Sequence, residues 1–356
     1  MDIIRATKAY EAWLRQRISL IEADLRLKHQ RMAQSPFPFL RATFYRWVQL
    51  WPRVCPELAT APAVLGVGDL HVENFGTWRD SEGRLIWGVN DFDEVALIPY
   101  PNDLVRLAVS AQIAIGGNHL SCDPADACDA ILAGYREGFG QGGAPFVLAE
   151  QHRGLRDLAT SELRDPTLYW QKFNELPTIR AGVPAAVKAA LNQALPEVGL
   201  RIRVVHRQAG LGSLGRRRFT ALAEWRGGWI AREAKELVVS AWHWESRGGA
   251  KILYQQAIDQ AVRVPDPFVS VKGCWLIRRL AADCSRIELG LLPKMRDELK
   301  LLHAMGWETA NIHLGTKAAA GGVLRDLAQR PGKWLRRAAE AMAKATLEDW
   351  KGWAKA

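Results

Sequence analysis

Two short stretches of the chain gather acidic and amide side chains between apolar runs. The first, GVGDLHVENFG (66–76), contains Asp69 and Asn74, and the second, NDFDE (90–94), contains Asp91 and Asp93. Phosphoryl transfer needs a carboxylate that orients or deprotonates the attacking hydroxyl, together with oxygen ligands for magnesium. The pattern therefore predicts a catalytic set of Asp69, Asn74 and Asp91, with Asp69 as the base. The predicted metal ligands are Asn74, Asp91 and Asp93.

The same stretches allow a second kind of metal site. Asp69, His71, Asp91 and Asp93 are all ligand types found in metal-dependent hydrolases. His71 and Glu73 also form the HxE pattern of zinc deaminases, but the sequence has no PCxxC partner, so we exclude that class. We expect His71 to form a hydrogen bond within its own loop.

A glycine-rich stretch, GLGSLG (210–215), lies much further along the chain. A dinucleotide-binding fold needs a helix directly after these glycines, whereas the segment here, RRRFTALAEW, is extended and ends at a Gly-Gly turn. A kinase-type glycine loop lies between antiparallel strands, covers nucleotide phosphates and is followed by a strand with a phosphate-binding lysine. Lys235 is placed to be that lysine. The residues expected to cover the phosphates are Gly210, Gly212, Ser213 and Gly215.

The apolar patterning predicts an α+β protein with two lobes. The acidic stretches follow short strands expected at 63–70 and 84–93, and a meander of antiparallel strands is expected at 203–236. We expect a large lobe of helices into which a small antiparallel sheet is inserted. The expected parts are a large helical lobe with the catalytic and metal loops (1–200), a β-rich nucleotide-binding lobe (201–286) and C-terminal helices that return to the large lobe (287–356).

Charge is unevenly distributed along the chain. The net charge is +10, and residues 201–356 carry 28 Lys and Arg against 15 Asp and Glu, a balance of +13. A segment with this excess of positive charge could bind a polyanion. Its basic residues are spread over strands and helices, so nucleic acid is not expected, whereas a phosphorylated or anionic substrate fits.

The five cysteines include no CxxC pair, which argues against a disulfide framework and a structural zinc site. No secretory signal and no apolar run of membrane-spanning length stands out in the sequence. We therefore expect a cytoplasmic protein with no membrane partner.

The order of the motifs resembles a known family. GDLHVEN, NDFDE and NDLVRLAVS resemble the GDxHxxN, DFD and DLA signature of aminoglycoside and choline kinases, in which the glycine loop comes first. The order found here resembles the bacterial family called domain of unknown function 2252. The matching segments are SPFPFLRAT, GDLHVENFG, NDFDE, PNDLVRLAVS, GLGSLG, AKEL, ILYQQAIDQ and WLIRRL. The chain departs from these patterns at Val67, where the kinases have histidine, and at Ala42, where the family has glycine.

That family resembles a circularly permuted protein-kinase-like fold. The resemblance implies ATP and Mg²⁺ as cofactors and phosphoryl transfer to a small-molecule hydroxyl; a nucleotide-binding pseudoenzyme or regulatory module is the alternative. It also implies that Asp103 caps a helix and braces the catalytic loop, and that residues 280–286 form the adenine-facing hinge. Kinases pair the lysine with a glutamate on the next helix. The helix GAKILYQQAIDQ has none, only Gln255, Gln256 and Asp259. Glu236 and Glu245 are nearby alternatives, and the sequence leaves the carboxylate partner of Lys235 open.

Overall fold

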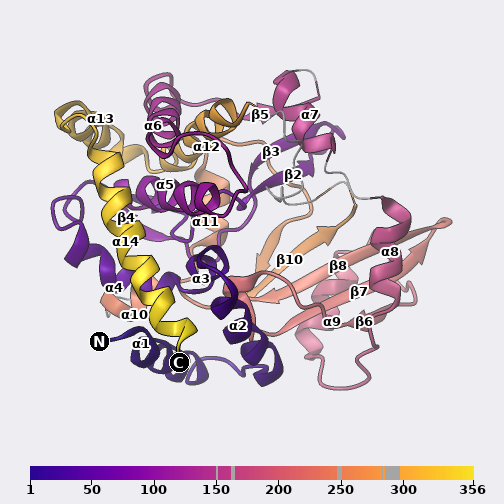
Figure 1. Ribbon diagram of the computed structural model, residues 1–356. Helices are drawn as coiled ribbons and strands as arrows, with labels where there is room; N and C mark the ends of the chain where they lie inside the picture. Colours follow the sequence, from indigo (N-terminus) through magenta and orange to yellow (C-terminus); the bar gives the residue numbers. More distant parts are fainter. Residues whose placement is uncertain (150, 162–164, 247–250, 283, 285–296) are drawn as a thin grey trace.

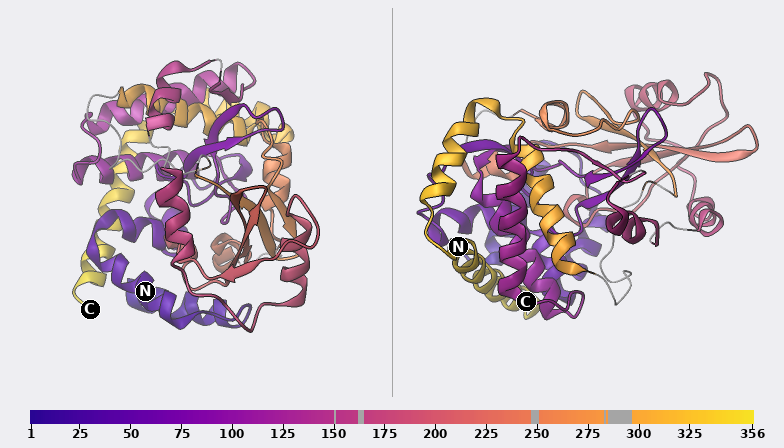
Figure 2. Two further views of the ribbon diagram at one scale, coloured as in Figure 1. Left: turned by 90° about the vertical axis from the view of Figure 1, so that its right-hand side faces the viewer. Right: turned by 90° about the horizontal axis from the view of Figure 1, so that it is seen from above.

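A helical part and a five-stranded sheet make up the molecule, as the ribbon views show (Figure 1, Figure 2). The computed structural model describes residues 1–149, 151–161, 165–246, 251–282, 284 and 297–356. Helices and small antiparallel sheets alternate in this part of the chain, which confirms the predicted α+β class. Part of the expected hinge, at 283 and 285–286, lies outside the described residues.

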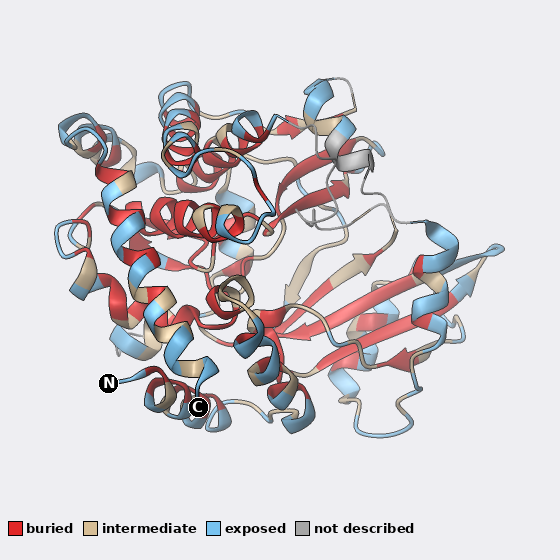
Figure 3. Ribbon diagram, viewed as in Figure 1, coloured by how far each residue is buried: buried red, intermediate tan, exposed pale blue. Residues whose placement is uncertain are grey.

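The helical part is built from both ends of the chain. The C-terminal helix α14 (Trp334–Ala354) packs along α5 and also contacts α1, α2 and α4, so the two termini lie close together (Figure 1). The interior between these helices is apolar and buried (Figure 3). The other helices of this part are α1 (Ile3–Arg15), α2 (Glu22–Gln34), α3 (Pro36–Ala42), α4 (Phe44–Val54), α5 (Pro101–Gly116), α6 (Pro124–Gly140), α7 (Arg153–Ser161), α10 (Ala241–Ser246), α11 (Tyr254–Gln260), α12 (Glu298–His313) and α13 (Ala320–Gln329).

The mixed-charge segment 4–33 predicts a single helix, and this prediction is wrong. The chain forms two helices, α1 and α2, and Arg17 N donates to Leu14 O, three residues back, in the turn that ends α1. Ile21 then donates its N–H to the carbonyl of Gly215, at 2.8 Å. This bond joins the connection between the two helices to the glycine-rich segment.

Two small antiparallel sheets hold the acidic stretches. Strand β1 (Ala63–Gly66) pairs with β4 (Ala96–Pro99), and β2 (Phe75–Arg79) pairs with β3 (Leu85–Val89), which also contacts β5 (Phe146–Val147). The first acidic stretch links β1 to β2 and the second links β3 to β4. Asn90 N donates to Asn74 O at 3.0 Å, so the two loops lie side by side.

The five-stranded sheet is antiparallel throughout, in the order β6-β7-β8-β10-β9. The predicted meander is confirmed. Two helices that precede residue 200 cover this sheet: α9 (Ala185–Gln193) packs on one face, and α8 (Pro166–Asn174) packs on part of the other. The strands are β6 (Arg203–Val205), β7 (Arg218–Trp225), β8 (Gly228–Glu236), β9 (Ser270–Lys272) and β10 (Trp275–Leu280).

None of the five cysteines, all of which fall within the described ranges, is in a disulfide. Across those same ranges no helix is long and apolar enough to cross a membrane.

Candidate active site

The loop that carries Asp69 is held by a buried carboxylate. Val67 N and Gly68 N donate to Asp103 Oδ2 and Oδ1 at 2.6 and 2.9 Å, so the predicted brace is confirmed. The predicted cap is wrong: α5 begins at Pro101 with Tyr100 as its N-cap residue, which places Asp103 inside the first turn, facing the loop. Gly68 has φ +80°, and a Cβ there would lie 2.3 Å from Glu94 O, so this turn requires glycine.

Two further buried side chains extend this brace. His313 on α12 contacts Asp103 Oδ2 through Nε2 at 3.0 Å, and Tyr135 on α6 contacts His313 Nδ1 through its hydroxyl at 2.9 Å. All three side chains are fully buried. The catalytic loop is therefore anchored to three helices, an arrangement that the local sequence around Asp69 gave no reason to expect.

Asp69 is held by an arginine that sequence reasoning missed. Arg106, on α5, donates Nε to Asp69 Oδ1 at 3.0 Å and NH2 to Leu40 O at 2.8 Å, and its guanidinium lies over the rings of Phe44 and Trp47. Burial raises the pKa of Asp69 to about 7, although the charge of Arg106 lowers it. The available signal was the single charged residue in the apolar run LVRLAVS.

Asn74 and His71 close the same loop. His71 N donates to Asn74 Oδ1 at 2.8 Å, and Glu73 N donates to His71 Nδ1 at 3.2 Å. The predicted hydrogen bond of His71 within its loop is confirmed. Asn74 Oδ1 has a second lone pair, so a metal ligated there would share this oxygen with the His71 N–H.

The glycine-rich segment lies directly against Asp69. A Cβ on Gly212 would lie 3.3 Å from Asp69 Oδ2 and 3.1 Å from Arg41 O, so glycine allows the close approach. The space left between this segment and the loop 66–76 is about 30 Å³, room for little more than one water molecule. The structure thus brings the glycine-rich segment against the loop 66–76 and leaves almost no space between them.

Helix α2 holds the glycine-rich segment in that position. Lys28 donates Nζ to Gly212 O at 3.1 Å. Asp24 contacts His206 Nε2 and accepts a hydrogen bond from Gln208, both at 2.7 Å. The first helical hairpin therefore clamps the segment between β6 and β7.

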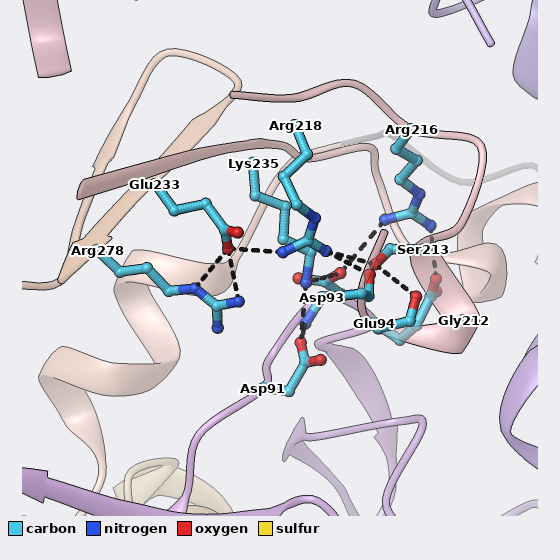
Figure 4. Close-up of polar contacts among 12 residues, drawn as sticks. Asp91, Asp93, Glu94, Gly212, Ser213, Arg216, Arg218, Glu233, Lys235 and Arg278 are labelled. Carbon is cyan, nitrogen blue, oxygen red and sulfur yellow. Dashed lines mark hydrogen bonds and ion pairs between the residues drawn. The ribbon is translucent and has the colours of Figure 1, made fainter. Parts of the chain in front are cut away.

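Lys235 extends from the sheet to the second acidic stretch (Figure 4). Its ammonium forms an ion pair with Asp93 and lies 3.4 Å from Asp91 Oδ1. Although burial opposes ionisation, the charges of Lys235 and Arg278 lower the pKa of Asp91 well below its ordinary value. Burial and the charge of Asp91 raise the pKa of Asp93.

Neither nearby alternative, Glu236 or Glu245, is the carboxylate partner of Lys235. Glu236 points to the opposite face of β8 and pairs with Arg217, because neighbouring residues of a strand face opposite ways. Glu245 lies on α10 and accepts a hydrogen bond from Gln49, on α4. The carboxylates that contact Lys235 are Asp91 and Asp93, from the loop between β3 and β4.

A magnesium ion fits the carboxylate groups at this place. Asp93 Oδ1 is buried and has no hydrogen-bond partner among the described residues, and Asp91 is partly exposed. Carboxylate oxygens are the ligands that Mg²⁺ prefers, and it keeps several waters when only one or two carboxylates bind it. No group of three or more His, Cys, Asp or Glu with metal-site geometry occurs in the described chain, which counts against the four-ligand hydrolase site.

Comparison with known families found a match for the part of the chain that carries the two acidic stretches. Residues 19–161 match the family described as "Uncharacterized protein conserved in bacteria (DUF2252)". The match covers less than half of the chain. Searches of curated proteins and of solved structures found no match. The DUF2252 segment contains both acidic stretches and Asp103, and it ends before the glycine-rich segment and Lys235.

Outside the DUF2252 segment, the sheet contributes a cluster of arginines that sequence reasoning missed. Glu233 is fully buried and accepts hydrogen bonds from Arg207, Arg218 and Arg278, with shortest distances of 2.9, 2.6 and 2.7 Å. Figure 4 shows the contacts with Arg218 and Arg278. These arginines and Lys235 line a cavity of about 400 Å³ that Asn74, Asp91 and Gly210 also line. The available signal was the alternation of Glu233 and Lys235 on one face of the strand AREAKE.

Proposed function

We propose that this protein is an ATP- and magnesium-dependent phosphotransferase that acts on the hydroxyl group of a small molecule. The observation that carries the proposal is the meeting of Lys235, from the sheet, with Asp91 and Asp93, from the helical part. Lys235 and Asp91 line the 400 Å³ cavity. A lysine on a strand and a carboxylate on the facing loop are the pair that phosphoryl transfer uses to hold phosphates and their metal.

Each predicted residue has a consistent role in this proposal. Asp69 is the general base, and its pKa near 7 suits proton transfer at neutral pH. Arg106 holds Oδ1 of Asp69, which leaves Oδ2 for the acceptor hydroxyl. Lys235 binds the phosphates. Asn74, Asp91 and Asp93 would hold Mg²⁺, whose positive charge would neutralise that of the phosphates.

The chain order supports a circularly permuted kinase-like fold with two lobes. The glycine-rich segment lies between β6 and β7, and Lys235 lies on β8, the next antiparallel strand. Protein kinases place their glycine loop and their β3 lysine in this way. Here the acidic loops precede both features in the sequence, and the C-terminal helices pack back on the helical part.

A nucleotide-binding pseudoenzyme or regulatory module is the second candidate. One observation favours it: Gly212 packs on Asp69, and the 30 Å³ between them holds no acceptor. Turnover therefore requires the glycine-rich segment to move away from Asp69. A module that only binds nucleotide in the larger cavity needs no such movement.

The test is a comparison of Asp91→Asn with Asp69→Asn. Asp91→Asn should weaken calorimetric binding of ATP with magnesium and abolish transfer. Asp69→Asn should leave that binding nearly intact and lower turnover by roughly two to four orders of magnitude, the scale for loss of a positioned base. Turnover is measured as ATP consumption with a library of hydroxyl compounds. Asp129→Asn, on the exposed surface of α6, is the control.

Three outcomes count against the proposal. If ATP with magnesium fails to raise the melting temperature of the protein, or NADH raises it equally, the cleft does not bind ATP as proposed. If neither variant changes ATP consumption, the pseudoenzyme is favoured. If both variants abolish metal binding equally, Asp69 and Asp91 share a metal and the hydrolase is favoured.

A further inference from the structure

Three arginines surround one carboxylate in the cavity. Arg207 and Arg278 each donate Nε and NH2 to Glu233, and Arg218 donates NH1 to it. One carboxylate neutralises one of the three guanidinium charges, so a charge of +2 remains. Burial of unbalanced charge is costly unless a partner compensates it.

The unused donors of this cluster face the cavity. Within the described part of the chain, NH1 of Arg207 and NH1 of Arg278 have no acceptor, and both side chains are about one quarter exposed, at 24% and 23%. Both residues line the 400 Å³ cavity. Two guanidinium groups therefore present free N–H donors to whatever occupies that space.

The cluster lies beside Lys235. Arg218 is directly opposite Lys235 on β7, and Arg278 is its diagonal neighbour on β10. Diagonal neighbours are roughly 7 Å apart. Asp91 and Asp93 pair with Lys235, whereas Glu233 is bound by the three arginines. The cavity thus has two adjoining cationic places, with Asp91 and Asp93 at one and Glu233 at the other.

The roof of the cavity at the cluster is not apolar. Arg218 and Arg278 line the cavity from one face of the sheet, with the buried Glu233 between them, and apolar residues lie to both sides along that face, at Leu276 and at Leu222, Ala231 and Leu280. An uncharged ring system offers these guanidinium groups single acceptor atoms or a π face, but no negative charge. A phosphate group does, because its oxygens accept the forked hydrogen bonds of arginine.

We propose that Arg207, Arg218 and Arg278, set around Glu233, form a second anion subsite, which binds a phosphate group beside the one held at Lys235. The ligand of the cavity therefore carries phosphate at both places. That phosphate belongs either to the polyphosphate chain of the nucleotide or to a phosphorylated acceptor. The inference rests on the same cavity as the proposed function and requires no turnover.

The experiment uses the full chain and inorganic tripolyphosphate without metal, measured by calorimetry. Arg207→Gln and Arg278→Gln should each weaken binding about ten- to hundredfold, the scale for one hydrogen bond to a charged group. Arg217→Gln, a cation on the opposite face of β7 that pairs with Glu236, is the matched control and should change nothing. If Arg278→Gln does not fold, the tripolyphosphate affinity of Arg207→Gln, which alters a residue just after the edge strand β6, tests the proposal.

Glu233→Gln separates binding from a structural role. Removal of the carboxylate charge frees guanidinium groups for phosphate, so tripolyphosphate should bind at least severalfold more tightly. A cluster that only holds the strands together predicts weaker or unchanged binding. The inference is overturned if the wild-type protein does not bind tripolyphosphate, if the arginine variants behave like Arg217→Gln, or if Glu233→Gln fails to tighten binding.

Two comparisons identify the source of the phosphate. If the arginine variants weaken ATP binding in parallel with tripolyphosphate binding, the subsite holds nucleotide phosphate. If ATP affinity is unchanged and tripolyphosphate still binds at saturating ATP, the subsite holds the phosphate of a second ligand. Asp91→Asn should keep metal-free tripolyphosphate binding while it loses magnesium-dependent transfer. Failure of the proposed function therefore remains distinguishable from failure of this inference.

Discussion

The pairing of Asp69 with Arg106 leads to a prediction that does not depend on knowing the substrate. In Arg106→Met the Asp69 carboxylate loses its buried partner, while methionine retains much of the apolar contact with Phe44 and Trp47. The cost of this change should depend on pH. Below about pH 5 Asp69 is protonated in both native proteins, so only packing and the bond to Leu40 are lost.

The magnitude follows from the pKa of Asp69. Breaking a buried ion pair costs about 3 to 5 kcal/mol, and 3 kcal/mol corresponds to a pKa rise of roughly 2 units. The pKa of Asp69 would move from about 7 to roughly 9 in the variant. A raised native pKa means that stability is lost as pH rises toward that pKa. The free energy of unfolding should therefore fall further in the variant than in the wild type between pH 7 and 9, by about 3 kcal/mol.

The assay is urea denaturation at pH 5, 7, 8 and 9, on the wild type, Arg106→Met, Asp69→Asn and the double variant. In the Asp69→Asn background, Arg106→Met should have the same cost at every pH. A penalty for Arg106→Met that stays constant from pH 5 to 9 with Asp69 present would refute the assignment of Arg106 as the charge partner of Asp69.

Two further predictions concern buried carboxylates. Asp103→Asn replaces one acceptor oxygen by a donor opposite two backbone N–H groups, and should lower the free energy of unfolding by about 2 to 4 kcal/mol in urea denaturation. Burial raises the pKa of Glu308 to about 7, so its native state holds a proton that the unfolded state releases above pH 4.5. The stability of the wild type relative to Glu308→Gln should therefore fall by about 3 kcal/mol between pH 4.5 and 7; no change over this range would contradict the prediction.

The elements that could be predicted are those whose pattern is local. The meander at 203–236 could be predicted because two strands flank a Gly-Gly turn. The places of the acidic stretches could be predicted because each follows an apolar strand. The break between α1 and α2 could not be predicted from the sequence. Its cause includes a bond from Ile21 to Gly215, nearly two hundred positions away, and no local pattern records such a contact.

The candidate site divides in the same way. Asp69, Asn74 and Asp91 could be chosen because acidic and amide side chains stood together in short motifs. The partners of Lys235 could not, because a search along the following strand and helix finds Glu236 and Glu245, whereas the fold supplies carboxylates from the loop after β3. Pairing across a fold is set by topology, and topology is not visible in a local window.

The two sides of the site also differ in how firmly they are held. The loop of Asp69 is anchored by Asp103 and His313, both fully buried and bonded to several elements. The glycine-rich segment is held by the buried Lys28 and Asp24 of α2. It places two side chains in the apolar core, Leu211 and Leu214, whereas the loop of Asp69 places three there, Val67, Leu70 and Val72. Local opening takes place where few buried apolar contacts must break. Movement that admits an acceptor beside Asp69 should therefore come from the glycine-rich segment, while the carboxylate side of the cavity stays in place.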